Sequence, residues 1–349
     1  MIYLSLPPDA KREPRKLPFF LAMEEFAARQ LEGNYFFMWQ VDPTVIYGRN
    51  QVPEAELDMA YCDAHHINYY RRKSGGGCVY ADRNNIMFAH IADCRDVTST
   101  FADYTEAVAS MLRDLGIADA SRTGRNDILI GDRKVSGYAF YHVKSAHTGR
   151  SRAIVHGTML YDADNDTMCA ALTPSGAKLA AKGVASVRQR VTTIREHCDI
   201  SLADFMAFAR RSMCSGEHIL TPADVAEIER MEQAYYNPAW LRARYTDNSD
   251  SATTTRIPGV GEISVDIRMD DRRIDSIALT GDFFSDADAT RTMLGAAVGI
   301  EATDTEAIVH AISPYIDRAI PGLPAAELAA LISRAASVEI GRASCRERV

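Results

Sequence analysis

The chain has no excess of basic residues and no long apolar run, and both absences exclude classes of protein. Its 349 residues include 39 Lys and Arg against 47 Asp and Glu, which gives a formal net charge of −8 at pH 7. A protein that binds nucleic acid through its surface charge carries a basic excess, so we expect no nucleic-acid partner. No stretch of 18 apolar residues is present, so we also expect no membrane partner.

Paired cysteines and a secretion signal are missing as well. The seven cysteines are scattered without a Cys-x-x-Cys pair, a distribution typical of free thiols in a reducing compartment. The segment from Pro7 to Pro18 is charged and interrupted by prolines, so it lacks the apolar core of a signal peptide. We therefore expect a cytoplasmic protein, and we expect it to be a monomer.

Three common ligand-binding motifs are absent. The glycine run at 75–77 does not end in Gly-Lys-Ser/Thr, which excludes a P-loop, and no helix clearly opens there, as a dinucleotide fingerprint requires. The pair His65-His66 lacks a second pair of ligands at a useful spacing, so no metal-binding cluster is predicted.

The apolar pattern predicts a mixed α/β (α+β) chain with two domains. With 47% apolar residues, the length is sufficient for two cores. Helical spacing predicts helices at Phe19–Leu31 and at about 102–115, the second of which stops at the cap residue Gly116. The polar stretch 144–152 is expected to be a mobile loop. Strand-like or hairpin runs are predicted at Tyr35–Trp39, Thr44–Tyr47, Ile67–Tyr70, 86–91, 127–141 and 153–161.

A change of composition near residue 246 predicts the domain boundary, because the six residues from there on are all polar, as in a linker. We assign 1–245 to a catalytic domain, 246–254 to the linker and 255–338 to a smaller α+β accessory domain. In the accessory domain a meander is predicted to turn at Asp270-Asp271. This domain is expected to contribute no catalytic residue, and the catalytic domain is expected to fold alone.

The last eleven residues, 339–349, are predicted not to belong to the natural protein. Their sequence, Glu-Ile-Gly-Arg-Ala-Ser-Cys-Arg-Glu-Arg-Val, is what one reading frame of a common sequencing adapter encodes. Cys345 then has no role, and the tail should pack poorly.

The motif with the most definite chemistry is a run of basic residues followed by three glycines. Glycines 75–77 let the backbone approach a ligand closely and turn its N–H groups toward an anion. Basic residues just upstream can offset phosphate charge. A triple glycine is also common in flexible surface turns, so the residues alone leave both interpretations open. The block reads Arg71-Arg72-Lys73-Ser74-Gly75-Gly76-Gly77-Cys78-Val79-Tyr80.

A second motif, Gly-Arg-Asn-Asp at 124–127, precedes a hairpin that carries Lys134. Asp127 is a candidate ligand for Mg²⁺ on bound phosphates, because hard cations prefer carboxylate oxygens. Lys134 could supply a fixed positive charge to a cleft and stabilise negative charge that develops there. A lone lysine is far more often solvated on a surface, which is the alternative interpretation.

The third motif, His156-Gly157-Thr158, lies on a predicted apolar strand. A lone histidine in that setting is more often a hydrogen-bonded core residue than a catalyst, and from the residues alone we interpret His156 in that way. A fourth block runs from Lys182 to Thr192.

In this order and at these separations, the motifs resemble those of the lipoate–protein ligase family. The resemblance runs from about Phe19 to Ile194 and is weaker through the second domain. Each motif is weak by itself, but the ordered set is highly specific. It comprises Gly48-Arg49-Asn50-Gln51, the Arg-Arg-x-Ser-Gly-Gly-Gly block, Gly-Arg-Asn-Asp, Arg-Lys-Val-Ser-Gly, His-Gly-Thr and Lys-Gly-x-x-Ser-Val-Arg-x-Arg-Val.

The resemblance implies a central mixed β-sheet catalytic domain of the biotin/lipoate ligase type with a smaller C-terminal α+β domain. It implies that lipoate and Mg-ATP give lipoyl-adenylate, and that the lipoyl group then passes to a lysine of an acceptor protein. The acceptors implied are lipoyl-domain proteins, namely the acyltransferase subunits of 2-oxoacid dehydrogenases and the H protein of glycine cleavage.

By position in the motifs, the resemblance assigns the catalytic role to Lys134, in contact with both the acyl carbonyl and the α-phosphate. Asp127 would hold Mg²⁺. The residues implied to bind ATP or the adenylate are Arg72, Ser74, Gly75, Gly76, Gly77, Cys78, Val79, Tyr80, Asn85, Asn126, Lys134 and Lys182. Those implied to bind lipoate are Lys134, Arg71, Gly76, His156 and Gly157.

One block departs from the family pattern. Where the family has His-Asp-x-Gly-Asn, this chain has Ala81-Asp82-Arg83-Asn84-Asn85. Loss of the histidine removes a contact. We expect Asn84 to adopt the positive φ that a glycine would have there, since Asn tolerates that region best after Gly.

Two other functions stay open at this point. A related class moves octanoyl or lipoyl groups between carrier proteins without ATP, in some members through a cysteine thioester. Cys78 and Cys169 keep that interpretation open, whereas the second domain argues against it. The third possibility is a non-catalytic carrier-binding or sensor protein, against which the intact Lys134, Asp127 and Arg72 argue.

Overall fold

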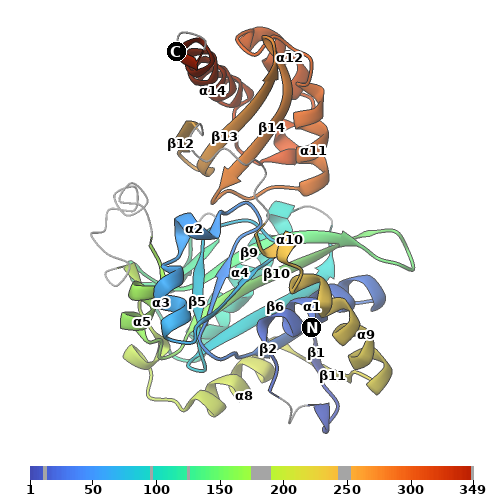
Figure 1. Cartoon of the computed structure of the whole chain (residues 1–349). Helices are drawn as coiled ribbons and strands as arrows, with labels where there is room; N and C mark the ends of the chain where they lie inside the picture. Colours follow the sequence, from blue (N-terminus) through green and yellow to red (C-terminus); the bar gives the residue numbers. More distant parts are fainter. Residues whose placement is uncertain (11–13, 95–96, 124–125, 174–189, 243–252, 347–349) are drawn as a thin grey trace. The chain divides into compact units, whose positions relative to one another are not determined.

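The computed structural model describes residues 1–10, 14–94, 97–123, 126–173, 190–242 and 253–346 (Figure 1). The chain forms two compact units. The main division falls after Leu241, close to the boundary predicted at 245–246, and most of the predicted linker lies outside the described residues. Two short segments of the first 80 residues group with the second unit, which composition did not predict. The first unit is Met1–Tyr47, Pro53–Arg72 and Cys78–Leu241; the second is Gly48–Val52, Lys73–Gly77 and Arg242–Val349.

The first unit is built on a large mixed β-sheet, as the resemblance implies. Its strands are β1 (Ile2–Ser5), β2 (Tyr35–Trp39), β6 (Asn85–Asp93), β7 (Ala120–Arg122), β8 (Asp127–Ile130), β9 (Arg133–Lys144), β10 (Ser151–Leu160) and β11 (Gly216–Ile219). They lie in the order β11-β1-β2-β6-β10-β9-β8-β7, in which β1 is parallel to both neighbours and the other pairs are antiparallel. A separate sheet has the order β4-β3-β5, from β3 (Thr44–Tyr47), β4 (Asn68–Arg71) and β5 (Val79–Ala81).

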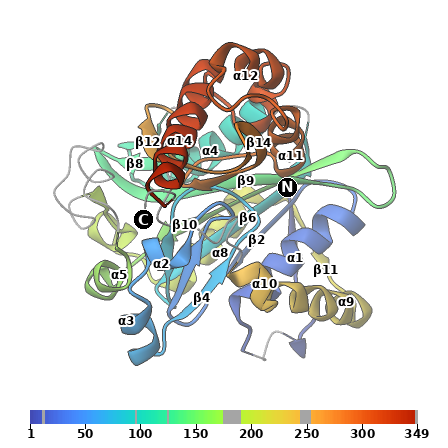
Figure 2. The same ribbon diagram turned by 45° about the horizontal axis from the view of Figure 1, so that its top comes forward.

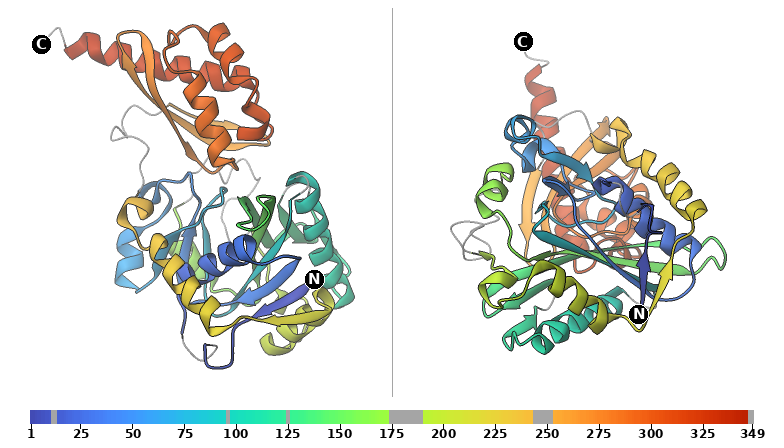
Figure 3. Two further views of the ribbon diagram at one scale, coloured as in Figure 1. Left: turned by 90° about the vertical axis from the view of Figure 1, so that its right-hand side faces the viewer. Right: turned by 90° about the horizontal axis from the view of Figure 1, so that it is seen from below.

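Helices cover both faces of the large sheet (Figure 2). One face is covered by α1 (Leu17–Gln30), which is backed by α9 (Pro222–Glu232), and the other by α4 (Val97–Asp114) and α8 (Leu202–Met213). Side chains alternate along a strand, so neighbours on β2 enter different cores: Phe37 packs under α1 and Phe36 under α4. We call the two faces of the sheet the α1 face and the α4 face, and the clusters of buried side chains packed on them the α1 core and the α4 core. Figure 3 shows the layers from two further directions.

The remaining elements of the first unit are short. They are α2 (Pro53–Glu56), α3 (Met59–Ala64), α5 (Asn165–Ala171), α10 (Pro238–Leu241) and two 3₁₀ turns, η2 (Ile194–Glu196) and η3 (Gln233–Tyr235). Both helices predicted above are confirmed: α1 matches closely, and α4 begins a few residues earlier than predicted. Gly116 follows α4 with a φ of +103°, as expected for a helix cap.

The polar segment expected to be a mobile loop is a hairpin. Lys144 and Ser151 end β9 and begin β10, and the turn between them is bonded to the end of α1. The amide of Ala146 donates to the carbonyl of Arg29 at 2.8 Å, and a ring nitrogen of His147 lies 3.2 Å from the carbonyl of Gln30. The turn therefore satisfies carbonyl groups that the helix leaves unpaired at its end.

The prediction for Asn84 is wrong. Among the described non-glycine residues, only His66 and Asp271 have a positive φ. The amide of Asn85 donates to the carbonyl of Asp82 at 3.2 Å, and the amide of Asn84 donates to the Asp82 carboxylate at 2.8 Å. These bonds form a turn with Asp at its first position, a turn type that uses negative φ at both central residues, so no left-handed residue is required.

The second unit is a small α+β domain, as predicted. A three-stranded antiparallel sheet is formed by β12 (Thr253–Ile257), β13 (Gly261–Asp270) and β14 (Arg273–Gly281), with the meander turning at Asp271. Its helices are α11 (Ala287–Ala296), α12 (Thr305–Ile312), α13 (Ile316–Ala319) and α14 (Ala325–Arg346).

The C-terminal segment predicted to be non-natural continues α14 as far as Arg346. Ala336 is the last buried side chain described in this helix, and Val338 and Ile340 after it are 43% and 39% exposed. Ile340, the second residue of the segment, is therefore exposed, and the non-natural origin of the segment stays a prediction. No helix in the described part of the chain is both long and apolar enough to cross a membrane.

A buried histidine lies in the α4 core. The ring of His90, on β6, stacks on that of Tyr104 at a centroid distance of 4.7 Å. Within the described structure its Nδ1 has no hydrogen-bond partner. Burial lowers the pKa of His90 to about 4, and the N-terminal ammonium and Arg152 act in the same direction. The folded protein therefore holds this imidazole neutral at a pH where the unfolded chain would protonate it.

We expect His90 to make the protein sensitive to acid. Between the unfolded pKa of about 6.5 and the folded pKa of about 4, the unfolded chain binds an extra proton, so stability falls as the pH drops through this window. Between pH 7.5 and pH 5, His90 should lower the free energy of unfolding by about 2 kcal/mol. Urea unfolding at both pH values should show that His90→Phe reduces the difference, whereas the exposed His310→Gln leaves it unchanged. An equal pH difference in all three proteins would contradict the assignment.

Candidate functional site

A bulge in the large sheet turns Lys134 toward the α1 face. Tyr141 on β9 lies in the α1 core, and strict alternation would place Val135 on the same face. Val135 lies instead in the α4 core, because the register between β8 and β9 shifts beside it. A bulge of this kind redirects the side chains on one side of it. Lys134 therefore points to the face opposite Val135.

The side chain of Lys134 lies over Gly137, three residues along the same strand. A Cβ built on Gly137 would be 2.1 Å from Nζ and 2.4 Å from Cε of Lys134. No side chain could occupy that space while Lys134 keeps its position. The glycine that ends the Arg-Lys-Val-Ser-Gly motif therefore makes room for the lysine at its second position.

One carboxylate joins two cations at this point. Nζ of Lys134 lies 2.7 Å from Oδ1 of Asp127, and Nη2 of Arg190 donates to Oδ2 at 2.6 Å. Burial lowers the pKa of Lys134, the nearby cations Arg190 and Arg72 lower it further, and Asp127 opposes them. Three cations thus act around a single carboxylate, so the site has a local excess of positive charge that suits an anionic ligand.

Arg72 is held to the small sheet of the first unit. It is 5% exposed, its backbone N–H donates to the carbonyl of Tyr47 at 3.0 Å, and Nη1 donates to the carbonyl of Ile46 at 2.8 Å. Burial lowers the pKa of Arg72 to about 10, so the guanidinium stays charged at neutral pH. The charge of Arg72 also acts on Lys134, whose pKa it lowers.

A strip of small residues runs along the α1 face away from Lys134. On β9 the strip begins with Gly137 and continues with Ala139, two residues further on the same face. Ala139 pairs with His156 on β10, and His156 pairs with Ala89 on β6. Gly137 and Ala139 on β9 and Ala89 on β6 therefore carry no side chain larger than a methyl group, and His156 on β10 lies between Ala139 and Ala89.

His156 lies between two of these small residues, Ala139 and Ala89, on the same face of the sheet. Its Nδ1 is 2.6 Å from Oε2 of Glu24 on α1, and both side chains are buried, which confirms a hydrogen-bonded core histidine. Oε1 of Glu24 and Nε1 of Trp39, another residue of the α1 core, are buried without a hydrogen-bond partner in the described structure. Buried polar atoms are normally paired, so these two are available to a ligand.

Other predicted residues serve the sheet itself. A Cβ on Gly157 would be 2.4 Å from the ring of Tyr138, which packs in the α4 core, so Gly157 admits an aromatic ring on the face opposite Lys134. Nδ2 of Asn126 donates to the carbonyl of Tyr138 at 3.0 Å, and the backbone carbonyl of Asn126 accepts the Tyr138 N–H at 2.8 Å.

Asn85 is fully buried, and its Nδ2 donates to the carbonyl of Tyr80 at 3.4 Å. Cys78 and Val79 are half-buried at the start of β5.

The glycine run belongs to the second unit, together with Ser74. Gly76 has a φ of +85°, and its N–H donates to the carbonyl of Phe283 at 3.2 Å. A Cβ on Gly75 would be 2.4 Å from the same carbonyl oxygen. Within this unit a glycine is therefore required at 75 by a close backbone approach and at 76 by the positive φ. That the run shares a cleft with Lys134 stays a prediction, and Lys182 lies outside the described residues.

The described residues do not form a site that could hold Mg²⁺ by themselves. In the ranges described they contain no group of three or more His, Cys, Asp or Glu side chains arranged for a metal. Both oxygens of Asp127 already face cations, Lys134 on one side and Arg190 on the other. Metal binding at Asp127 would require one of these cations to move.

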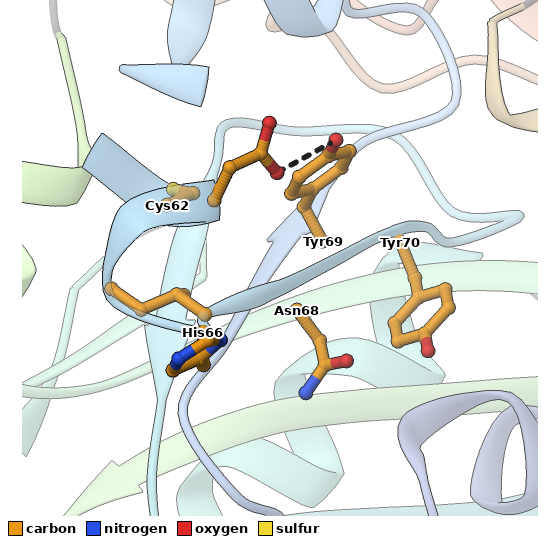
Figure 4. Close-up of a pocket in the computed structure, with 7 residues that line it drawn as sticks. Cys62, His66, Asn68, Tyr69 and Tyr70 are labelled. Atoms are coloured by element: carbon orange, nitrogen blue, oxygen red, sulfur yellow. Dashed lines mark hydrogen bonds between the residues drawn. The ribbon is translucent and has the colours of Figure 1, made fainter. Parts of the chain in front are cut away.

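A shallow pocket of about 380 Å³ lies elsewhere, beside β4 (Figure 4). In it, the hydroxyl of Tyr69 donates to the Asp63 carboxylate at 3.3 Å. None of the residues predicted from the motifs lines this pocket, so it does not compete with the Lys134 site. Its lining consists of Cys62, Asp63, His66, Ile67, Asn68, Tyr69 and Tyr70.

Sequence reasoning missed several residues of the Lys134 site. Arg190 lies inside the last motif block, so the signal was present but its partner was not visible. Glu24 was signalled only by being a charged residue within a mostly apolar stretch of α1, and Trp39 only by the apolar strand that carries it. Their partners are far away in sequence, which is why the pattern alone could not assign them.

Comparisons with known proteins agree with the motif order. The family model of the lipoyl protein ligase A/B catalytic domain matches residues 18–213. The chain is 34% identical over 306 residues to lipoate–protein ligase 1 of Staphylococcus aureus, with 84% of this chain and 90% of the relative covered.

Two solved structures extend the comparison. A bipartite lipoate protein ligase of Thermoplasma acidophilum, described together with its E2 lipoyl domain, is 25% identical with a TM-score of 0.59 and covers 71% of this chain and 98% of its own. LipL1 of P. falciparum, in complex with lipoate, is 17% identical with a TM-score of 0.72 and covers 96% and 99%. The second similarity shows that the fold is shared along nearly the whole chain.

Gly137→Ala should force Lys134 from its place. The added methyl group would meet Nζ at 2.1 Å, and overpacking of this kind costs about 1–3 kcal/mol. Urea unfolding should show this loss of stability for Gly137→Ala in the otherwise unchanged protein. In a protein that already carries Lys134→Ala, the same change should cost little or nothing, because the obstructing side chain is then gone. Gly295→Ala, where a Cβ would meet nothing within 4 Å, is the control and should not destabilise the protein. An equal cost in both backgrounds would show that Lys134 does not fill this space.

Proposed function

Because the chain belongs to the lipoyl protein ligase A/B catalytic-domain family, we propose that it is a lipoate–protein ligase. It uses ATP to convert lipoate to lipoyl-AMP and transfers the lipoyl group to a lysine of an acceptor protein. The observation that carries the proposal is the position of Lys134, whose largely buried ammonium shares Asp127 with Arg190 and lies within electrostatic reach of Arg72.

This arrangement suits adenylate formation. The first step brings together two anions, the carboxylate of the acid and the α-phosphate of ATP, and negative charge then builds on the phosphate and the leaving pyrophosphate. The ammonium of Lys134 and the guanidinium of Arg72 are already held in place, so they stabilise this charge without reorganising. When the acceptor amine attacks the adenylate, the carbonyl oxygen becomes negative, and the same ammonium can stabilise it.

We propose that the acyl chain follows the strip of small residues from Gly137 toward His156. The methyl groups of Ala89 and Ala139 leave room for an extended chain above the strands, and ligand sites are typically apolar with a few convergent polar groups. The unpaired Oε1 of Glu24, whose other carboxylate oxygen lies 2.6 Å from His156, would meet the far end of the acid.

For the nucleotide, we propose contacts from Arg72, the glycine run 75–77 and the start of β5, as the motifs imply. Mg²⁺ usually binds through one or two carboxylates together with substrate phosphates. Since the described residues offer no site made of protein alone, we expect the ion to arrive on the phosphates of ATP.

The acceptors we propose are lipoyl-domain proteins. The support is the Thermoplasma acidophilum ligase, which was described together with an E2 lipoyl domain and shares 25% identity with this chain. Acyltransferase subunits of 2-oxoacid dehydrogenases and the H protein of glycine cleavage are the acceptors to try first.

An ATP-independent transferase is the competing proposal, because the motifs of the sequence leave that related class open. Such an enzyme would use a cysteine at the acyl centre in some members. Cys78 is half-buried and Cys169 exposed on α5, so both can be tested by replacement. Lipoate-dependent exchange of pyrophosphate into ATP would support the ligase, whereas transfer from an acyl-carrier protein without ATP would support the transferase.

Lys134→Ala should abolish both half-reactions while the fold is retained. Loss of one preorganised charged group typically costs on the order of 10²–10³ in rate. We expect this loss in lipoate-dependent pyrophosphate exchange and in transfer from synthetic lipoyl-AMP. Lys134→Arg should not restore activity, because the planar guanidinium cannot occupy the same point between two oxygens. The matched control is Lys144→Ala at the exposed end of the same strand, which should keep full activity. Near-normal exchange by Lys134→Ala would contradict the role.

A further inference from the structure

Arg71 is the neighbour of Arg72 in sequence, but its side chain lies in different surroundings. It is fully buried, with Cζ 5.0 Å from the centroid of the Tyr47 ring and 5.8 Å from that of Trp240. Cations are attracted to the faces of aromatic rings, most strongly to tryptophan. The guanidinium therefore contacts the faces of two aromatic rings.

We call Tyr47, Arg71 and Trp240 the Arg71 cluster. Three hydrogen bonds join Tyr47 and Arg71 to the end of α10, the helix that carries Trp240. The hydroxyl of Tyr47 and Nη2 of Arg71 both donate to the carbonyl of Leu241, at 2.7 and 3.3 Å. Nε1 of Trp240 donates back to the carbonyl of Arg71 at 3.1 Å. Burial raises the pKa of Tyr47 to about 12, so its hydroxyl keeps its proton at neutral pH. Residues some 170 positions apart in sequence thus form one closed set of bonds.

The same cluster also holds the backbone of Arg72. The carbonyl of Tyr47 accepts the Arg72 N–H at 3.0 Å, while its hydroxyl reaches Leu241. Arg71 ends β4 directly before Arg72, and its carbonyl accepts the Trp240 bond at that same peptide. A movement of α10 would therefore act on the peptide that places Arg72.

We propose that Tyr47, Arg71 and Trp240 are positioning residues that set the affinity for the nucleotide by fixing Arg72 against α10, the last described helix before the linker. The inference rests on the proposed function, in which Arg72 contacts the nucleotide. It gives Arg71 a role different from the lipoate contact implied by the motif.

The experiment removes one donor at a time. Trp240→Phe keeps an aromatic ring and loses Nε1, and Tyr47→Phe keeps the ring and loses the hydroxyl. Each should raise the KM for ATP in pyrophosphate exchange, and the Kd for ATP measured directly by calorimetry, by about threefold to tenfold, the effect of one hydrogen bond. The KM for lipoate should stay within about twofold, because the strip on the α1 face is untouched. The double variant tests whether the two bonds act together.

Tyr236→Phe is the matched control, since it removes a hydroxyl from another aromatic residue of the same C-terminal segment of the unit and should leave both KM values unchanged. A purely structural role would lower the Tm of the Trp240 and Tyr47 variants without a selective change for ATP. Unchanged ATP affinity, or equal changes in both KM values, would overturn the inference. If the natural protein binds ATP but forms no lipoyl-AMP, the proposed function fails, while the ATP affinities of the variants still decide this inference.

Discussion

The burial of one ammonium group is the constraint on which the candidate site depends. Moving a charge out of water is costly unless it is paired, and Asp127 is the carboxylate that pairs with Lys134 while it also receives Arg190. The bulge in β9 directs the lysine, and Gly137 leaves the space that its ammonium occupies. Since one carboxylate faces several cations, the balance is left positive, which is the condition for receiving an anion.

The motif glycines have different physical reasons. Gly137 makes room for Lys134 and Gly157 for the ring of Tyr138, and Gly75 lies against the carbonyl of Phe283. In each case an atom of this chain occupies the position of the missing Cβ. A glycine-rich motif can thus reflect packing within the protein as much as contact with a ligand. The two explanations are compatible only where a ligand approaches from another side.

The sequence was sufficient to predict the mixed sheet, the helices α1 and α4, and the meander of the second unit. Those features follow from local periodicity or from the ordered motifs. It could not predict the Glu24–His156 pair, whose members are 132 residues apart, or the grouping of Lys73–Gly77 with the second unit, because tertiary contacts decide both. Asn84 failed for a local reason: the Asp82 carboxylate closes a turn that needs no left-handed residue, so turn chemistry replaced the expected glycine-like conformation.

The two adjacent arginines show how one strand end can serve two tasks. Successive side chains of an extended chain point in opposite directions, so Arg71 and Arg72 have different surroundings. Arg72 acts on Lys134, and Arg71 lies between the rings of Tyr47 and Trp240. A motif with two basic residues in sequence therefore supplies one charge to the site and one to the scaffold. Because a single peptide joins them, the scaffold charge fixes the place from which the other one acts.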